Sequence, residues 1–207
     1  MTALADTASL VDALKYADKY ATLAINDFDG PFTDAVMPLL SNRFVWIPLY
    51  LLLAVWLILR LGWRKALVVI IVVALSVGAI DQIANLVKVA VHRLRPCWDS
   101  FMTDNGLRLL EKRGSRFGFF SAHAATTAGV ATAVLYFLKH WSTPSRRRTL
   151  AWIFALWVAA ISISRIYVGK HFLGDIIAGA FAGIIIARVI SWAVRLLINK
   201  YFVKFVN

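Results

Sequence analysis

Long apolar runs, separated by short basic segments, make up most of the chain after residue 43. The runs cover about residues 44–61, 66–91, 122–137, 150–168 and 172–197. Several approach the ~20 residues that an α-helix needs to cross a bilayer. The pattern predicts an all-α fold, a polytopic membrane helical bundle of five to six helices. Residues 1–207 are expected to form a single integral-membrane domain, with the transmembrane bundle at 44–198.

The segment before the first run is too polar to span a membrane. In residues 8–27, Leu10 and Leu14 repeat at helical spacing, while Asp12 and Lys15 fall on the other side. This amphipathic pattern favours a helix that lies in the membrane surface or one that packs on the bundle. Asp-Gly-Pro at 29–31 then breaks the helix. Residues 1–43 are therefore expected to form an interfacial helix and a turn, without a cleavable signal peptide.

Composition and charge narrow the class of protein. Hydrophobic residues make up 60% of the chain and the mean hydropathy is +0.71, which is too apolar for an ordinary soluble domain of this length. The net charge of +12 arises from basic residues at the ends of apolar runs and in one loop. Attraction to anionic lipid and phosphate explains this placement better than nucleic acid does. The single Cys97 allows no internal disulfide and fits no metal-ligand cluster.

The second apolar run ends in a stripe of polar residues on one helical face. The stripe consists of Asp81, Asn85, Lys88, His92 and Arg95. Ionisable groups in a span usually face the bundle interior or a water-filled cavity. Lys88 and Arg95 are two turns apart, ~10 Å along the axis, so their side chains can converge on one anion. A loop after the helix end would bring Arg95 closer. Asp81 and Asn85 are assigned a structural role.

A second polar stretch, residues 164–175, lies between the last two apolar runs. If the chain is helical from Phe172 onward, His171 and Asp175 are one turn apart on one face. The carboxylate can then hold the imidazole in one tautomer. Arg165 offers a planar fork of donors that suits phosphate. Taken alone, the stretch could also be a polar juxtamembrane turn whose histidine and aspartate pair for structural reasons.

Three ordered motifs connect these stretches and resemble the signature of the type 2 phosphatidic acid phosphatase superfamily. That signature reads K-x6-R-P, then P-S-G-H, then S-R-x5-H-x3-D. The first and third parts match in residue type and spacing, whereas the middle part keeps only its serine and histidine. The matching positions are Lys88, Arg95-Pro96, Ser121-Ala122-His123, Ser164-Arg165, His171 and Asp175. Phe120 stands where the family has proline, and Ala122 stands where it has glycine. Alanine disfavours a positive φ that glycine would allow, but the loop is expected to tolerate it, because every side chain with a chemical role remains.

The resemblance implies a catalytic role for each matching residue. Catalysis would fall to His171 as nucleophile, Asp175 as its orienting carboxylate and His123 as general acid and base. Phosphate binding would fall to Lys88, Arg95, Ser121, Ala122 and Arg165. Neither a metal nor a cofactor is implied, because no carboxylate cage accompanies these cations.

The activity expected from the resemblance is hydrolysis of a membrane lipid phosphate through a phosphohistidine. Undecaprenyl diphosphate is slightly favoured as substrate, and lipid A, phosphatidylglycerophosphate and phosphatidic acid are the alternatives. A non-catalytic anion-binding membrane protein is the competing class, although it would not need His123, His171 and Asp175. The expected partners are the lipid substrate and the bilayer, without nucleic acid.

Charge also bears on orientation in the membrane. With five spans, the segments 60–65 and 139–148 and the C-terminal end share one side, and the motifs share the other. The Lys and Arg counts of the two sides are nearly level, because the motif loop is itself basic. When Arg95 is set aside as an active-site residue, the balance tips modestly to the cytoplasm for the first side. The site is then expected to face the periplasm or cell exterior from a multi-pass cell inner membrane. Cys97 would label from outside if its thiol is not buried. The charges of 97–120, beyond Arg95, are expected to be solvated or to face lipid headgroups rather than to be catalytic.

Overall fold

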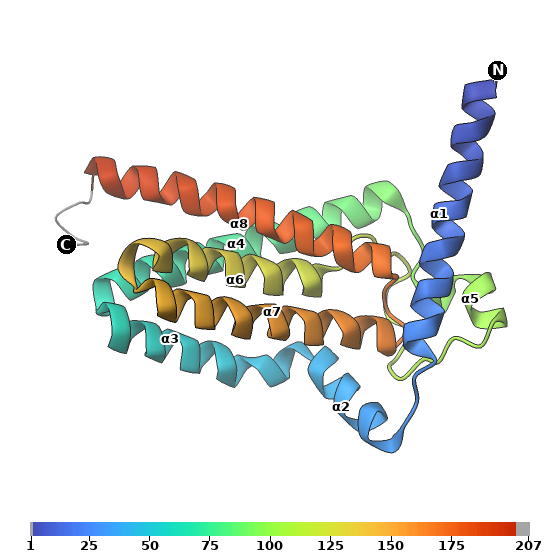
Figure 1. The fold of residues 1–207 in the computed structure, drawn as a ribbon, viewed down its shortest axis with the longest axis horizontal. Helices are drawn as coiled ribbons and strands as arrows, with labels where there is room; N and C mark the ends of the chain where they lie inside the picture. The colour runs from blue at the N-terminus through green and yellow to red at the C-terminus, as the bar shows by residue number, and fades with distance from the viewer. Residues whose placement is uncertain (1, 202–207) are drawn as a thin grey trace.

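The chain folds into an all-helical bundle in the computed structural model, which confirms the predicted fold class (Figure 1). The structure describes the backbone of residues 2–201 and the side chains of residues 9–201. In chain order the α-helices are α1 (Thr2–Asn26), α2 (Pro31–Ser41), α3 (Ile47–Leu61), α4 (Trp63–Val91), α5 (Ser100–Asp104), α6 (Ala122–Trp141), α7 (Pro144–Tyr167) and α8 (Leu173–Tyr201), with 3-10 turns at Arg43–Trp46 and Pro96–Trp98.

The five long helices of the bundle run alongside one another, with α6 between α4, α7 and α8 (Figure 1). Four helical segments of the described chain are long and apolar enough to cross a membrane: Arg43–Leu61, Trp63–Val91, Pro144–Tyr167 and Leu173–Tyr201. The predicted span at 122–137 is α6, which is not one of these four. Its many Ala, Thr and Gly residues lower its hydropathy, and most of its side chains are buried by its neighbours. α6 is thus the central helix of the bundle rather than a lipid-facing one.

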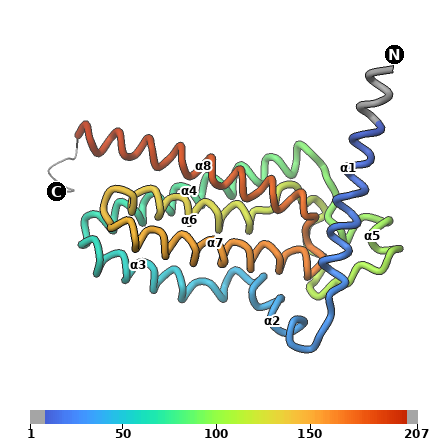
Figure 2. The backbone as a smooth tube through the Cα atoms, viewed as in Figure 1, coloured from blue at the N-terminus to red at the C-terminus, as the bar shows by residue number. Residues whose placement is uncertain are grey.

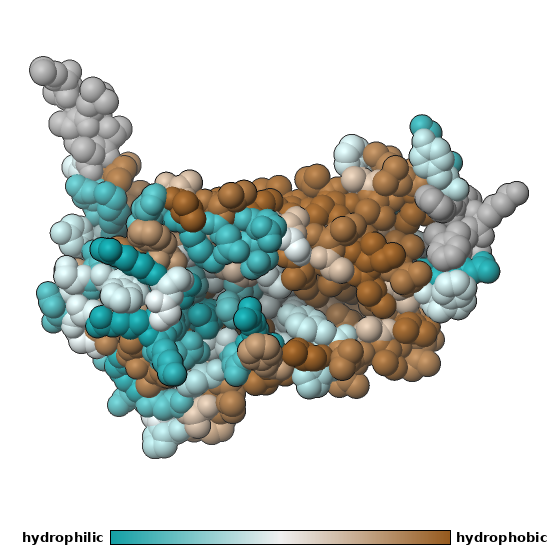
Figure 3. Space-filling view, turned by 180° about the vertical axis from the view of Figure 1, so that it is seen from behind, coloured by the Kyte–Doolittle hydropathy of each residue, from teal (hydrophilic) through white to brown (hydrophobic). Residues whose placement is uncertain are grey.

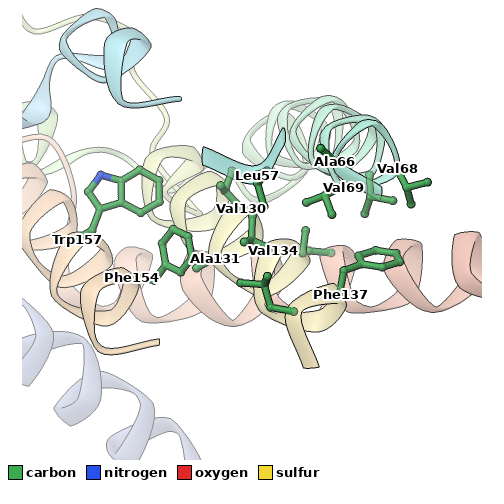
Figure 4. Close-up of a cluster of buried hydrophobic side chains, with 14 of the residues drawn as sticks. Leu57, Ala66, Val68, Val69, Val130, Ala131, Val134, Phe137, Phe154 and Trp157 are labelled. Atoms are coloured by element: carbon green, nitrogen blue, oxygen red, sulfur yellow. The ribbon is translucent and has the colours of Figure 1, made fainter. Parts of the chain in front are cut away.

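The bundle has an apolar core and an apolar outer surface. The largest cluster of buried side chains packs α3, α4, α6 and α7 together through residues such as Leu57, Val69, Val134 and Trp157 (Figure 4). Outside, hydrophobic residues cover a broad band of the bundle, and polar residues gather at the end where α1 and α5 lie (Figures 1 and 3). Side chains exposed on this band meet lipid tails in a membrane, where they need no further partner.

α8 approaches α6 closely at two glycines one turn apart. A Cβ on Gly179 would stand 2.5 Å from the carbonyl oxygen of Ser121. A Cβ on Gly183 would overlap the carbonyl group of Ala125. Small residues allow membrane helices to pack backbone against backbone, which is the role the sequence suggested for α6. The glycines of α8 complete that contact, which joins the first turns of the two helices near the motifs.

Two segments expected to be irregular are helical instead. The turn at 27–31 leads directly into α2, so the N-terminal segment holds more than a helix and a turn. The expected connection at 139–148 is much shorter, because α6 continues to Trp141 and α7 already begins at Pro144. The Thr143 side chain accepts a hydrogen bond from the Arg146 N–H at 3.4 Å. A threonine N-cap followed by proline is a helix start signal that outweighs the polarity of the arginines that follow.

α1 crosses the end of the bundle and points away from it (Figures 1 and 2). Its second half packs on the bundle: Asn26 donates to the Tyr167 carbonyl at 2.7 Å, and Lys19 pairs with Asp99 at 2.8 Å. Farther from the bundle, Leu10 and Leu14 are 60% and 62% exposed. The packed alternative is therefore correct for the second half of α1, while the apolar side chains before it remain free to contact a membrane surface.

Candidate active site

The ends of four bundle helices meet beneath α1. The last turns of α4 and α7 and the first turns of α6 and α8 lie here, and the Ser121 N–H donates to the Asp175 carbonyl at 3.0 Å. The structure therefore brings the three motifs to one end of the bundle. This is expected, because a loop joins the first motif to the second and the antiparallel pair α6 and α7 joins the second to the third. The motif residues found here are Lys88, Arg95, Ser121, Ala122, His123, Arg165, His171 and Asp175.

His171 and Asp175 form the contact predicted from their spacing. His171 Nδ1 is 3.3 Å from Asp175 Oδ2, which also accepts a hydrogen bond from the Phe172 N–H at 3.1 Å. Both side chains are buried, with 2% and 0% exposed. The helix begins at Leu173, so His171 precedes its first turn. Because Nδ1 faces the carboxylate, Nε2 is the ring nitrogen left for chemistry.

Positive charge surrounds this histidine. Burial, followed by the charges of Arg165, Arg95 and Lys88, holds the pKa of His171 well below its ordinary value. Each of these effects disfavours the protonated, positively charged form of the ring. The imidazole is thus neutral at physiological pH, with a lone pair on Nε2. Cations that keep a nucleophile unprotonated also attract an anionic substrate to it.

Arg165 is held in place but retains a free donor. Its Nη1 contacts the Ser41 side chain and lies 3.5 Å from Glu111 Oε2. Its buried Nε has no hydrogen-bond partner among the described residues. A buried donor of this kind is costly unless a ligand satisfies it. The sequence did not indicate Ser41, which lies at the end of α2.

The prediction that the charges of 97–120 are solvated or face lipid headgroups is wrong for Glu111, whereas Lys112, Arg113 and Arg116 are exposed. Glu111 contacts Arg165 and Ser41 at the site. Lys170 is buried, and its Nζ donates to the carbonyls of Lys112 and Arg113, the latter at 3.0 Å. The loop therefore folds over the motif residues because buried cations recruit its carboxylate and carbonyl oxygens.

Arg95 lies beyond the end of α4, which ends at Val91. His92 adopts a left-handed conformation with φ 54°, so the chain turns out of the helix. The Arg95 N–H then donates to the Arg116 carbonyl at 3.0 Å, and its Nε donates to the Phe117 carbonyl at 3.2 Å. These bonds fix Arg95 beside the loop. Lys88 is half-buried on the last turns of α4, and its Nζ makes no hydrogen bond to another described residue.

The middle motif begins α6. The Ser121 hydroxyl caps this helix by accepting from the Ala124 N–H at 3.5 Å. Ala122 is the first helical residue and has no positive φ. The conformation that only glycine favours is thus not needed here, and alanine fits. His123 lines a cavity of about 510 Å³. Arg43 of the 3-10 turn, Tyr50 of α3 and residues of α4, α6 and α7 form the rest of its wall.

Arg93 is a further site residue that the sequence did not indicate. Its Nη1 is 2.8 Å from Asp175 Oδ1, and its Nη2 is 2.5 Å from Asp18 Oδ2 in α1. Asp18 also accepts from the Gly174 N–H at 2.8 Å, and Thr22 accepts from the Leu173 N–H at 3.0 Å. Side chains of α1 therefore cap the start of α8 and, through Arg93, hold the carboxylate that orients His171. No local pattern signals pairs this far apart in sequence.

Arg93→Met is expected to lower kcat about 10- to 100-fold with little change in KM, as for outer partners that orient histidine ligands. The change leaves the buried Asp175 carboxylate without its cationic partner, so His171 loses its fixed orientation. Steady-state kinetics on a phosphorylated lipid measure both constants. Arg93→Lys should recover part of kcat, and Asp18→Asn, which keeps the Arg93–Asp175 pair, should cost less than Arg93→Met. An equal loss in all three variants would indicate a purely structural role.

A family model describes most of the bundle: residues 62–198 match the PAP2 superfamily, the type 2 phosphatidic acid phosphatases. The chain belongs to the PAP2 superfamily. The matched residues contain all three motifs, and they exclude the helices α1, α2 and α3. The resemblance seen in the motifs is thereby confirmed, and the chain has the helical membrane architecture of this superfamily.

Relatives of this PAP2 chain are lipid phosphatases. It is 30% identical over 176 residues to lipid A 4'-phosphatase of Bacteroides thetaiotaomicron, covering 84% of this chain and 75% of the relative. It is 30% identical over 115 residues to phosphatidylglycerophosphatase B of Bacillus subtilis, covering 54% and 52%. The fold is similar to the crystal structure of a transmembrane PAP2 type phosphatidylglycerolphosphate phosphatase from Bacillus subtilis, with a TM-score of 0.67, 21% identity, and coverage of 91% of this chain and 88% of that one.

Proposed function

We propose that the chain is an integral-membrane phosphatase that removes a phosphate group from lipid A through a phosphohistidine intermediate. The observation that carries this proposal is the buried His171–Asp175 pair, whose imidazole is kept neutral by a surrounding group of cations at one end of an apolar bundle. A neutral nucleophile next to unsatisfied phosphate-binding donors suits phosphoryl transfer. A protein that only binds anions needs the donors but has no use for an oriented neutral imidazole.

The first chemical step joins Nε2 of His171 to phosphorus. The Nε2 lone pair attacks, the bond from phosphorus to the lipid oxygen breaks, and His123 as imidazolium donates a proton to that oxygen. Asp175 stabilises the positive charge that develops on the His171 ring. Lys88, Arg95 and Arg165 stabilise the negative charge on the three equatorial oxygens.

The second step regenerates the enzyme with water. His123, now neutral, takes a proton from the attacking water, the P–N bond breaks, and inorganic phosphate leaves. His123 and His171 are then in their starting protonation states. The side chains of this site supply the charge stabilisation that a magnesium ion provides in many phosphoryl transfer enzymes. We therefore expect the reaction to proceed without added metal.

One observation favours lipid A over the other substrates. The relatives that match over most of this chain, from Bacteroides thetaiotaomicron and Porphyromonas gingivalis, are both lipid A 4'-phosphatases. The cavity beside His123 has apolar walls, including Phe44, Trp46 and Ile161, that suit the chains of any of these lipids. Phosphatidylglycerophosphate is the second candidate, because phosphatidylglycerophosphatase B matches over about half of the chain. The undecaprenyl diphosphate expectation has no comparable support from these relatives.

Phosphate release from a panel of lipids tests this proposal. The purified chain in detergent micelles is given lipid A, phosphatidylglycerophosphate, phosphatidic acid and undecaprenyl diphosphate, each with and without excess chelator. We expect the highest kcat/KM on lipid A, and we expect chelator to leave most of the turnover intact. Higher kcat/KM on another lipid of the panel would replace lipid A as the substrate. Complete loss with chelator, restored by magnesium, would overturn the metal-independent mechanism.

The location we propose is the cell inner membrane, with the site facing the periplasm or cell exterior. Native Cys97 cannot report on this, because its side chain is buried and its Sγ contacts the Arg113 carbonyl. Cysteines at the exposed positions Asp104 and Ser145, each in a Cys97→Ala background, replace it as reporters. An impermeant maleimide should label the first in intact spheroplasts and the second only after lysis. The reverse pattern would place the site in the cytoplasm.

A further inference from the structure

A second cavity lies at the end of the bundle opposite the candidate active site. It measures about 930 Å³ and opens between α6, α7 and α8. Lys139 on its wall is 16 residues beyond His123 on the same helix, about 24 Å along the axis. The cavity is therefore separate from the site and has no part in the mechanism. It is called the basic cavity below, because six basic residues line it: Lys139, His140, Arg147, Arg148, Arg188 and Arg195.

No acidic residue balances these charges. Of the 11 Asp and Glu residues, only Asp175 lies beyond position 111, and none lies between Asp34 and Asp81. None of the described residues forms a salt bridge with a member of the basic cavity. Arg195 instead donates to the imidazole of His140, which is neutral when it accepts this bond. The remaining positive charges, those of the lysine and the four arginines, gather at one cavity without a carboxylate and favour an anion among them.

The position of Arg188 distinguishes the basic cavity from the basic residues that ordinarily lie at the cytoplasmic ends of membrane helices. Basic residues at helix ends and short loops, such as Arg60 and Arg146, follow the usual charge bias of membrane proteins. Arg188 instead lies near the middle of α8, 13 residues after Asp175 and 13 before Tyr201. That is about 20 Å from either point, so its charge falls within the depth of the hydrocarbon. A charge at this depth is costly unless it faces a polar cavity and a counter-ion.

The walls of the cavity add an apolar component. Leu135 and Ile184 line it beside the arginines, and exposed hydrophobic residues such as Ile185 and Val189 continue from it along α8. A free phosphate ion would satisfy the arginines but would gain nothing from these side chains. A phospholipid would place its headgroup among the cations and its acyl chains along the apolar surface of the bundle. The combination favours a lipid over a soluble anion.

We propose that the basic cavity binds the phosphate headgroup of an anionic membrane lipid in the leaflet opposite the candidate active site. The bound lipid neutralises Arg188 and joins α6, α7 and α8 at this end of the bundle. This assignment does not depend on the proposed phosphatase activity, because none of its residues belongs to the motifs.

Native mass spectrometry of the full chain in detergent tests the proposal by lipid titration. Phosphatidylglycerol serves as the anionic lipid, phosphatidylcholine as the zwitterionic control, and inorganic phosphate as the soluble anion. We expect phosphatidylglycerol to bind the wild-type chain more tightly than phosphatidylcholine. Inorganic phosphate at the same concentration should not displace it. Equal affinity for the two lipids would overturn the proposal, and displacement by phosphate would assign the cavity to a soluble anion instead.

Two double variants locate the binding. Arg188→Gln with Arg195→Gln should weaken phosphatidylglycerol binding about 30-fold, which corresponds to about 1 kcal/mol for each basic side chain. Arg60→Gln with Arg146→Gln removes the same charge from exposed positions outside the cavity and should leave the affinity unchanged. Should the first variant misfold, Arg188→Lys with Arg195→Lys keeps the charge and should retain the lipid preference. Unchanged affinity in a folded Arg188→Gln, Arg195→Gln chain would show that the lipid binds elsewhere.

Discussion

Replacement of His171 by alanine is expected to reduce lipid phosphatase turnover by about 10⁴-fold or more, while lipid binding persists. The magnitude follows from loss of the proposed nucleophile, which the surrounding cations cannot replace. Lys88, Arg95 and Arg165 keep their charges in this variant and should still hold the phosphate. Phosphate release measured under single-turnover conditions, together with a lipid-binding assay, separates chemistry from binding.

Two other variants serve as comparisons for His171→Ala. Asp175→Asn should retain a trace of activity, because the nucleophile remains although its orientation is lost. His92→Asn is the matched control, since His92 lies near the motif loop but outside the proposed mechanism. Asparagine tolerates the left-handed conformation at this position, so turnover should stay within about threefold of wild type. Near-normal turnover in purified His171→Ala protein would remove His171 from the role of nucleophile.

Gly183→Val is expected to destabilise the bundle by about 3 kcal/mol or more, enough to unfold many proteins of marginal stability. Even a Cβ at this position overlaps the carbonyl group of Ala125, and backbone atoms cannot move aside as a flexible side chain can. α8 would have to separate from α6, and the link between Ser121 and Asp175 would be lost with it. Thermal unfolding in detergent, followed by circular dichroism, measures the change.

Gly78→Ala is the control for this prediction. Gly78 lies in α4, and nothing stands within 4 Å of a Cβ placed on it. Alanine in a helix is favoured over glycine by about 0.5–1 kcal/mol, so this variant should be neutral or slightly more stable. A Gly183→Val protein with the melting temperature of wild type would show that the two helices are not packed backbone to backbone.

The features that sequence predicted well are those that depend on local spacing. The four-residue interval from His171 to Asp175 predicted their contact, and the structure shows it, with His171 just before the first turn of α8 rather than within the helix. The apolar runs located the long helices, because burial in lipid requires continuous apolar segments. The small residues of α6 indicated close helix packing, and its partner glycines in α8 bear this out.

The features that sequence missed depend on contacts between distant segments. Arg93 pairs with Asp18 and Asp175, which lie 75 and 82 positions away, and no periodicity links such residues. Glu111 lies in a polar loop by sequence, and folding places it beside Arg165. The sequence predicts one helix and a turn before residue 44 and does not predict α2, an 11-residue helix with prolines at 31 and 38. For Arg93 and Glu111, tertiary contacts rather than local pattern determine the environment.

The capping of α8 by α1 has a consequence for the order in which the molecule can be assembled. Asp18 and Thr22 emerge from the ribosome about 150 residues before Leu173 and Gly174. They later accept hydrogen bonds from the N–H groups of these two residues. α1 must therefore wait, with these acceptors unoccupied, until the last helix has entered the membrane. Contacts of such long sequence separation form late, because a large loop must be closed first. The geometry proposed for catalysis is thus completed only after α8 has been inserted, and under that proposal an unfinished chain in the membrane would not yet attack phosphate esters.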